Sequence, residues 1–272
     1  MDSKRILYVS QEIHPYLPEN EISKPSLALP KKMNERGHQV RVFMPRYGLI
    51  NERRHQLHEV IRLSGINIIV NDMDQPLIIK VASVPQARMQ VYFIDNEEYF
   101  KRKATFYDED DNFFEDNDQR AIFFCRGVVE TVKKLGWSPD IIHCHGWMAS
   151  FLPMYLKKFH YDDPLFAESK LVLSVYDHKE HKMGDSLKKN LEFDGIDGED
   201  LARYEDADLN KLYAAAAHYC DGAVVGSENV SQEVKDMIAK NVDTLVDYSG
   251  EDDQADKIQE LYETIVVEES VA

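Results

Sequence analysis

Residues 5–44 of the chain read RILYVSQEIHPYLPENEISKPSLALPKKMNERGHQVRVFM. The first six form a short, nearly continuous apolar run, which is typical of a strand buried in a parallel sheet. Apolar residues then recur at helical spacing, so we expect a helix over 23–36 that ends at Gly37. A second apolar strand is predicted over 39–44. This order of strand, helix and strand predicts a right-handed parallel unit.

The rest of the chain continues this alternation. Strands are predicted at 140–144, 171–175 and 223–225, and helices at 117–135, 147–158, within 185–217 and at 228–240. The stretch 55–95 instead has short strands joined by turns, which predicts a small β excursion at a sheet edge, and 192–208 is predicted to be a flexible loop. The whole pattern predicts an α/β fold with a single Rossmann-like, doubly wound parallel sheet over residues 1–250.

The last residues, 251–272, differ from the rest in composition. They hold 8 acidic side chains and one lysine. Nevertheless, Ile258, Leu261, Tyr262 and Ile265 recur at helical spacing and predict a C-terminal amphipathic helix with one apolar face. Such a helix needs a surface, so we expect it to pack on its own domain or on a partner.

The charge of the chain excludes several classes of partner. The 272 residues include 49 acidic and 32 basic side chains, which gives a formal net charge of −17. Nucleic acids and anionic membranes repel such a surface, so neither is expected as a partner. Because no apolar run spans a bilayer, no signal peptide is recognisable and the three cysteines fit reduced thiols, we expect a cytoplasmic protein.

The main cluster of site candidates stands at the end of the predicted strand 140–144 and includes His143, His145 and Trp147. Open parallel sheets bind ligands outside the carboxyl ends of their strands, so one imidazole is expected to face a polar substrate, or else to pair with a backbone carbonyl. We expect the two histidines to point to opposite faces of the strand. On that basis no metal site is predicted.

Two smaller clusters follow later strands. Tyr176 and Asp177 open a polar stretch that forms either part of an acid/base pair or a solvated loop. Ser227 either faces the crevice or caps the helix that follows it. The sequence contains no GxGxxG, P-loop, GxSxG or HExxH pattern, and we expect no cofactor.

Ordered blocks across residues 4–230 resemble a known family. They include Ile6-Leu-Tyr-Val-Ser-Gln-Glu12, Arg36-Gly-His38, Val42-Phe-Met-Pro-Arg-Tyr47, Gly136-Trp137 and Pro139-Asp-Ile-Ile-His-Cys-His145. With these blocks the chain resembles the N-terminal domain of bacterial glycogen synthase and plant starch synthase, the ADP-glucose-dependent glucosyltransferases of the GT-B fold. The resemblance implies glucosyl transfer to an α-1,4-glucan, with His145 matching the catalytic-site histidine.

The loop that binds the donor in this family departs from the family pattern. The family's Lys-x-Gly-Gly-Leu aligns with Pro18, Glu19, Asn20, Glu21 and Ile22. The replacements remove a cation and two glycines that let backbone N–H groups approach a phosphate. They also add two negative charges, and each lost charge-assisted hydrogen bond is worth roughly 1.5–3 kcal/mol. The loop is therefore expected to be unfit for ADP-glucose.

Other parts of the family pattern differ as well. Gly146 replaces the aspartate of the family's His-x-His-Asp-Trp, and Tyr176-Asp177 replaces its His-Asn pair. Nothing in 231–272 resembles the family's second Rossmann domain, whereas 257–266 resembles its last helix, which packs back on the first domain. We interpret 251–272 as an acidic tail with a crossover helix, kept after loss of the donor domain.

Two hypotheses follow. In the first, the chain is a glycosyltransferase of the glycogen/starch synthase type, inactive alone, that uses ADP-glucose and an α-glucan when a partner chain supplies the donor domain. In the second, it is a non-catalytic relic of the acceptor domain that binds a glucan or a protein. Aromatic side chains would then stack on sugar rings, and the candidates are Tyr107, Phe113, Phe114 and Trp147. The altered donor loop favours the second hypothesis.

Overall fold

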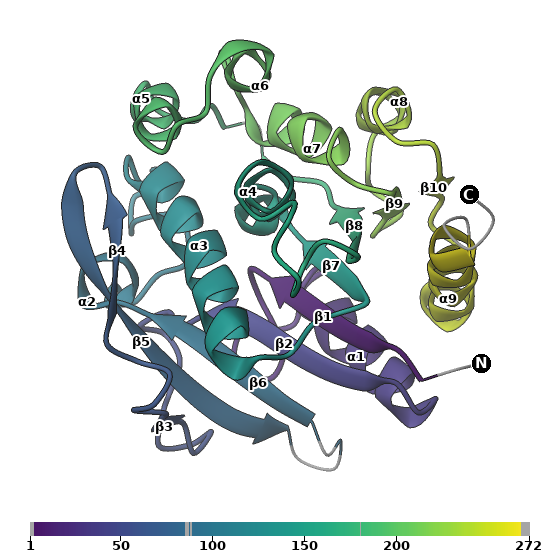
Figure 1. Cartoon of the computed structure of the whole chain (residues 1–272), viewed down its shortest axis with the longest axis horizontal. Coiled ribbons are helices and arrows are strands. Elements are labelled where there is room, and N and C mark those ends of the chain that lie inside the picture. Colours follow the sequence, from purple (N-terminus) through teal and green to yellow (C-terminus); the bar gives the residue numbers. More distant parts are fainter. Residues whose placement is uncertain (1–2, 85–86, 88, 180, 268–272) are drawn as a thin grey trace.

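A central sheet with helices on both faces forms the frame of the molecule (Figure 1). The computed structural model describes residues 3–84, 87, 89–179 and 181–267. Seven of the described strands run parallel in the order β10-β9-β8-β7-β1-β2-β6. Their bounds are β1 Arg5–Ser10, β2 Gln39–Pro45, β6 Met89–Asp95, β7 Ile141–His145, β8 Lys170–Val175, β9 Gly222–Val225 and β10 Leu245–Val246. The predicted doubly wound α/β fold is confirmed.

The small β excursion forms the far edge of the sheet. Strand β5 (Met73–Val84) pairs antiparallel with β6, and β3 (His58–Glu59) and β4 (Ile66–Val70) both pair antiparallel with β5. The prediction for 55–95 was wrong in one part. Residues 90–94, which this prediction placed in the excursion, lie within β6, which pairs in parallel with β2, so they belong to the main sheet.

Most of the described helices lie on one face of the sheet (Figure 1), where α3 contacts β2, β4 and β6, α7 contacts β8, and α4 packs against α3 and α7. The bounds are α2 Glu97–Phe100, α3 Asn117–Leu135, η1 Trp147–Ala149, α4 Leu152–Phe159, α5 Ser186–Phe193, α6 Gly198–Ala202, α7 Leu209–Ala217 and α8 Gln232–Ala239. The flexible loop predicted at 192–208 is wrong where α6 lies, because Leu201 is buried and fixes that turn. No helix in the described ranges is long and apolar enough to cross a membrane.

Helices α1 (Pro25–Glu35) and α9 (Glu251–Val267) cover the opposite face. Each of the four apolar residues predicted to form the stripe of α9 is 3% exposed, so the predicted packing of this helix is confirmed. Helix α9 contacts α1, β9 and β10. Because α4 and α7 lie on the other face, α9 is what shields this side of β9 and β10 from water.

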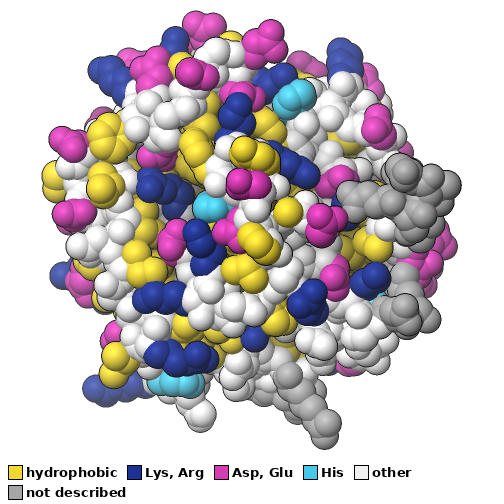
Figure 2. Space-filling view, in the orientation of Figure 1, with side chains coloured by type: hydrophobic (Ala, Val, Ile, Leu, Met, Phe, Trp, Pro, Cys, Tyr) yellow, Lys and Arg dark blue, Asp and Glu magenta, His cyan; other side chains and the backbone are white. Residues whose placement is uncertain are grey.

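The surface charges are mixed on the face drawn in Figure 2. Acidic side chains are spread among lysines and arginines on this face and do not gather in one patch. On this face, the acidic excess of the sequence therefore forms no single negative surface.

Candidate functional site

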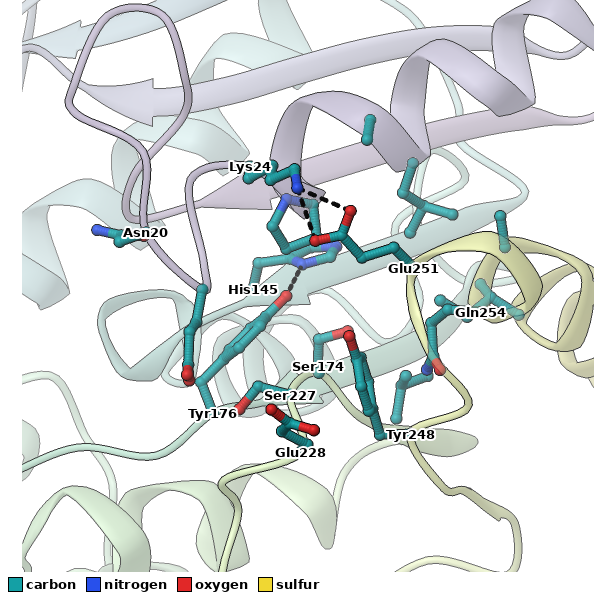
Figure 3. A pocket seen from close by; sticks show the side chains of 18 of the residues that line it. Asn20, Lys24, His145, Ser174, Tyr176, Ser227, Glu228, Tyr248, Glu251 and Gln254 are labelled. Atoms are coloured by element: carbon teal, nitrogen blue, oxygen red, sulfur yellow. Dashed lines mark hydrogen bonds and ion pairs between the residues drawn. The ribbon is translucent and has the colours of Figure 1, made fainter.

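A cavity of about 480 Å³ lies at the carboxyl ends of β7, β8 and β9, between the start of α1 and the start of α9 (Figure 3). This is the edge where open parallel sheets bind ligands, beside the switch in strand order between β1 and β7. Polar and aromatic side chains from the loop after β1, the strand ends and the segment entering α9 line it. The main ones are Glu19, Asn20, Glu21, Lys24, Lys32, His145, Ser174, Tyr176, Ser227, Glu228, Tyr248, Glu251 and Gln254.

His145 contributes a neutral ring to the wall of the cavity. It is 2% exposed, and its Nδ1 lies 2.8 Å from the Tyr176 hydroxyl. Burial lowers the pKa of His145 to about 3, so the ring is uncharged at neutral pH. Its Nε2 is buried and has no hydrogen-bond partner among the described residues. The ring therefore contributes no positive charge to the cavity wall.

His143 lies on the same face of β7 as His145, so the prediction of opposite faces was wrong. Side chains two residues apart on a strand point the same way, and the two ring centroids are 4.3 Å apart. His143 bonds through Nδ1 to the Tyr262 hydroxyl (2.6 Å) and through Nε2 to the Ser174 hydroxyl (2.7 Å). It therefore ties α9 to the sheet instead of facing the cavity. The described residues contain no cluster of three or more potential metal ligands.

Ser227 lines the cavity and does not cap a helix. Ser227 is 6% exposed, and its Oγ has no hydrogen-bond partner within the described part of the chain. The cap of α8 is Ser231, whose Oγ accepts from the Val234 N–H at 3.3 Å. Capping by Ser227 was one of the two expectations for this residue, and it is wrong.

The other crevice candidates are Tyr176, Asp177 and Trp147, and they differ in whether they face the cavity. Tyr176 lines the cavity, whereas Asp177 is exposed and does not appear in its lining. Trp147 is 1% exposed and packs against Phe106 and Phe113 at centroid distances of 5.1 and 5.6 Å. Trp147 is therefore a core side chain and not a platform for a sugar ring.

Asn20 and Ser23 engage several backbone N–H groups in and directly after the loop 18–22. Asn20 Oδ1 accepts from the N–H groups of Ile22 (2.9 Å) and Ser23 (2.7 Å). Ser23 Oγ accepts from the Asn20 N–H (2.9 Å) and donates to the Pro18 carbonyl (2.7 Å). The N–H of Lys24 donates to the Asn20 carbonyl. These four amides are therefore not available to a phosphate.

The charges around the cavity disfavour an anion. Four carboxylates and two ammonium groups line it, which is an excess of two negative charges: Glu19, Glu21, Glu228 and Glu251 against Lys24 and Lys32. Lys24 Nζ lies 2.6 and 2.7 Å from the two carboxylate oxygens of Glu251. Lys32 Nζ donates to the Asp252 carbonyl at 3.1 Å. Both cations are thus engaged by the first turn of α9.

Gly146 explains why the family's aspartate has no place here. Its φ is +85°, and a Cβ at this position would lie 2.3 Å from Oε1 of Gln11. That oxygen also accepts from the Met148 N–H at 3.2 Å. The Gln11 side chain therefore fills the space that a side chain at position 146 would need.

The segment entering α9 was missed as part of the site. Tyr248, Glu251 and Gln254 line the cavity, although the sequence predicted only that α9 covers apolar surface. The pair Lys24–Glu251 joins residues 227 positions apart. No local spacing in the sequence signals such a contact, so only the packing of α9 against α1 discloses it.

Comparisons with known proteins place this geometry in context. Residues 5–247 match the family model of the starch synthase catalytic domain. A glycogen synthase of Chlorobium limicola is 37% identical over 218 residues, which are 79% of this chain and 44% of the relative. A glycogen synthase of Chlorobaculum tepidum is 33% identical over 237 residues, 85% of this chain and 47% of the relative. The chain thus spans about half the length of these curated relatives.

Among solved structures, the fold is similar to the catalytic domain of Starch Synthase IV from Arabidopsis thaliana bound to ADP and acarbose. The match has a TM-score of 0.71 at 15% identity and covers 90% of this chain and 52% of the other. At this identity the match shows a shared fold.

Proposed function

Because this chain belongs to the starch synthase catalytic-domain family, we propose that its 272 residues bind an α-glucan or a partner protein and do not transfer glucose from ADP-glucose by themselves. The family match confirms the resemblance predicted from the sequence. A cytoplasmic location is part of the same proposal.

The hydrogen bonding of the loop 18–22 carries this proposal. In the family, the aligned lysine and glycines meet the donor's phosphates. Here Asn20 and Ser23 engage four backbone N–H groups, those of Asn20 and Ile22 within the loop and those of Ser23 and Lys24 directly after it. A diphosphate would have to break these bonds and approach Glu19 and Glu21, which line the same cavity. With these amides engaged, the loop brings two carboxylates and no cationic side chain to meet an anion.

The test is incorporation of labelled glucose. The purified chain is incubated with labelled ADP-glucose and glycogen, with Chlorobium limicola glycogen synthase as the positive control. We expect no transfer above a buffer blank, because the loop does not bind the donor. Turnover by the chain that is abolished by His145→Ala would contradict the proposal and assign His145 to the reaction.

A second candidate function is a glucosyltransferase completed by a partner chain that supplies a donor site. The place of His145 favours it, because this residue lines the cavity and its Nε2 has no hydrogen-bond partner among the described residues. The same assay with added C-terminal half of the Chlorobium limicola enzyme separates the candidates. Transfer that needs both chains and His145 supports the second candidate, and transfer by neither chain supports the first.

A further inference from the structure

A second cavity, of about 360 Å³, lies where β2 and β6 begin and β5 ends (Figure 1). We call it the Arg41 cavity. The described residues that line it are Val40, Arg41, Ser83, Met89, Gln90 and Tyr92. None of them lines the cavity at the carboxyl ends of β7, β8 and β9. The two cavities therefore lie at opposite ends of the parallel strands, and the proposed function makes no use of the Arg41 cavity.

The guanidinium of Arg41 is held by two aromatic rings. Its central carbon lies 4.7 Å from the ring centroid of Trp137 and 5.9 Å from that of Tyr92. Such contacts use the flat faces of a guanidinium and leave the N–H groups along its edge unpaired. Nη1 is buried and has no hydrogen-bond partner, and no carboxylate of the described residues pairs with Arg41. The rings therefore fix the plane of a cation that has no counterion.

The missing counterion carries an energetic cost. Arg41 is half-buried, and burial lowers the pKa of its guanidinium because the charged form loses hydration. The neighbouring charge of Arg62 also lowers this pKa. Guanidinium groups nevertheless keep their proton in proteins, so the charge remains. A charge withdrawn from water is costly unless an opposite charge pairs with it. The arrangement therefore indicates an anion from outside the chain.

The rest of the polar lining consists of further hydrogen-bond donors. Oε1 of Gln90 accepts from the Tyr92 hydroxyl at 3.3 Å, which leaves the NH₂ group of Gln90 as a donor. Ser83 stands opposite Gln90 in the pairing of β5 with β6 and adds a hydroxyl. Among the described residues, the lining holds one cation and no carboxylate. This composition suits a ligand that accepts hydrogen bonds and carries negative charge.

We propose that the Arg41 cavity binds a small oxyanion, the phosphate or carboxylate group of a small molecule, through the edge of the Arg41 guanidinium, with Ser83 and Gln90 as further donors. A guanidinium matches both groups because it can donate two parallel N–H bonds to two oxygens. The net charge of −17 does not prevent this binding. At physiological salt, exposed charges more than about 8 Å away are largely screened, whereas the oxyanion contacts Arg41 directly.

The experiment is a calorimetric titration of sodium phosphate, and separately of sodium acetate, into the full chain at constant ionic strength. We expect saturable binding of at least one anion, with a change in the fluorescence of Trp137, whose ring contacts Arg41. Arg41→Gln removes the charge and should weaken binding roughly ten- to hundredfold, as expected for lost charge-assisted hydrogen bonds. The two anions distinguish a phosphate ester from a carboxylic acid as the source of the oxyanion.

Arg53→Gln is the matched control, because it removes the same charge from an exposed arginine outside the cavity lining and should bind like the wild type. Ser83 is exposed, so Ser83→Ala should fold even if Arg41→Gln does not, and it should weaken binding roughly three- to tenfold. Three results would overturn the inference. They are no saturable binding of either anion, an equal loss of affinity in Arg53→Gln, and an unchanged affinity in Arg41→Gln or, where that variant does not fold, in Ser83→Ala.

Discussion

The protonation of His145 is controlled by burial. The ring is 2% exposed, and its one described bond is to a neutral hydroxyl, so its charged form loses hydration without gaining a carboxylate. Its pKa falls to about 3 in the folded chain, against about 6.5 in the unfolded chain. Between these values the unfolded state binds a proton that the folded state does not. Stability therefore falls as the pH is lowered through this window.

We expect His145→Gln to reduce this pH dependence. Removing one such histidine should lower the slope of unfolding free energy against pH by up to about 1.4 kcal/mol per pH unit between about pH 6 and about pH 4. Denaturant titrations at a series of pH values measure the slope. Identical slopes for His145→Gln and wild type would show that His145 titrates normally in the folded chain.

Among the elements, α9 contacts both the central sheet and α1. Its Tyr262 hydroxyl bonds to Tyr8 of β1 (3.1 Å) and to His143 of β7, and its acidic first turns meet Lys24, Lys32 and Arg36 at α1. The helix thus joins the two sides of the cavity as well as covering the sheet. Burial of its apolar stripe is the main stabilising contribution, because the charged contacts lie near the surface.

Leu261→Ala tests this packing. The side chain is 3% exposed, and a Cβ added at Gly222 would lie 3.0 Å from it, so the site is tightly filled. We expect the free energy of unfolding to fall by about 2–5 kcal/mol, as for other buried leucines. Thr264→Ala, on the exposed face of the same helix, should change it by less than about 0.5 kcal/mol.

Truncation of the chain after Gly250 tests the packing of the whole of α9. We expect a lower melting temperature or self-association, because the uncovered face of β9 and β10 is apolar. Rapid hydrogen exchange throughout 256–266 in the intact chain, together with an unchanged melting temperature on truncation, would show that α9 does not pack.

The elements also show what the sequence can predict. Long periodic segments such as α3 and α9, and the buried strands β1 and β7, were predicted because their apolar spacing is unambiguous. The two-residue strands β3 and β10 carry too little pattern to be recognised. Ser227 and Ser231 both precede α8, and only the backbone geometry decides which one caps it.

The cavity could be predicted only in part. His145, Tyr176 and the loop 18–22 were located because they follow strands, where a parallel sheet gathers its ligand-binding residues. The wall formed by α9 depends on contacts between residues more than 200 positions apart, and these contacts leave no local pattern. The pairing of Asn20 with its own loop likewise required the backbone to be in place.

At the scale of the whole molecule, the net charge and the family resemblance lead to opposite expectations about an anionic donor. The resemblance seen in the sequence implies ADP-glucose as donor, whereas a net charge of −17 repels a diphosphate at long range. Around the cavity the same conflict recurs, because both lining lysines are engaged by α9. The net charge of the molecule therefore supports the proposal that the loop 18–22 does not bind a diphosphate.

Calorimetric titration of ADP-glucose into the purified chain tests the central claim most directly. We expect no saturable binding, because Asn20 and Ser23 already engage four amides in and directly after the loop 18–22 and the cavity lining carries an excess of negative charge. Chlorobium limicola glycogen synthase, titrated in the same buffer, shows that binding is detectable. A micromolar dissociation constant for this chain would contradict the account.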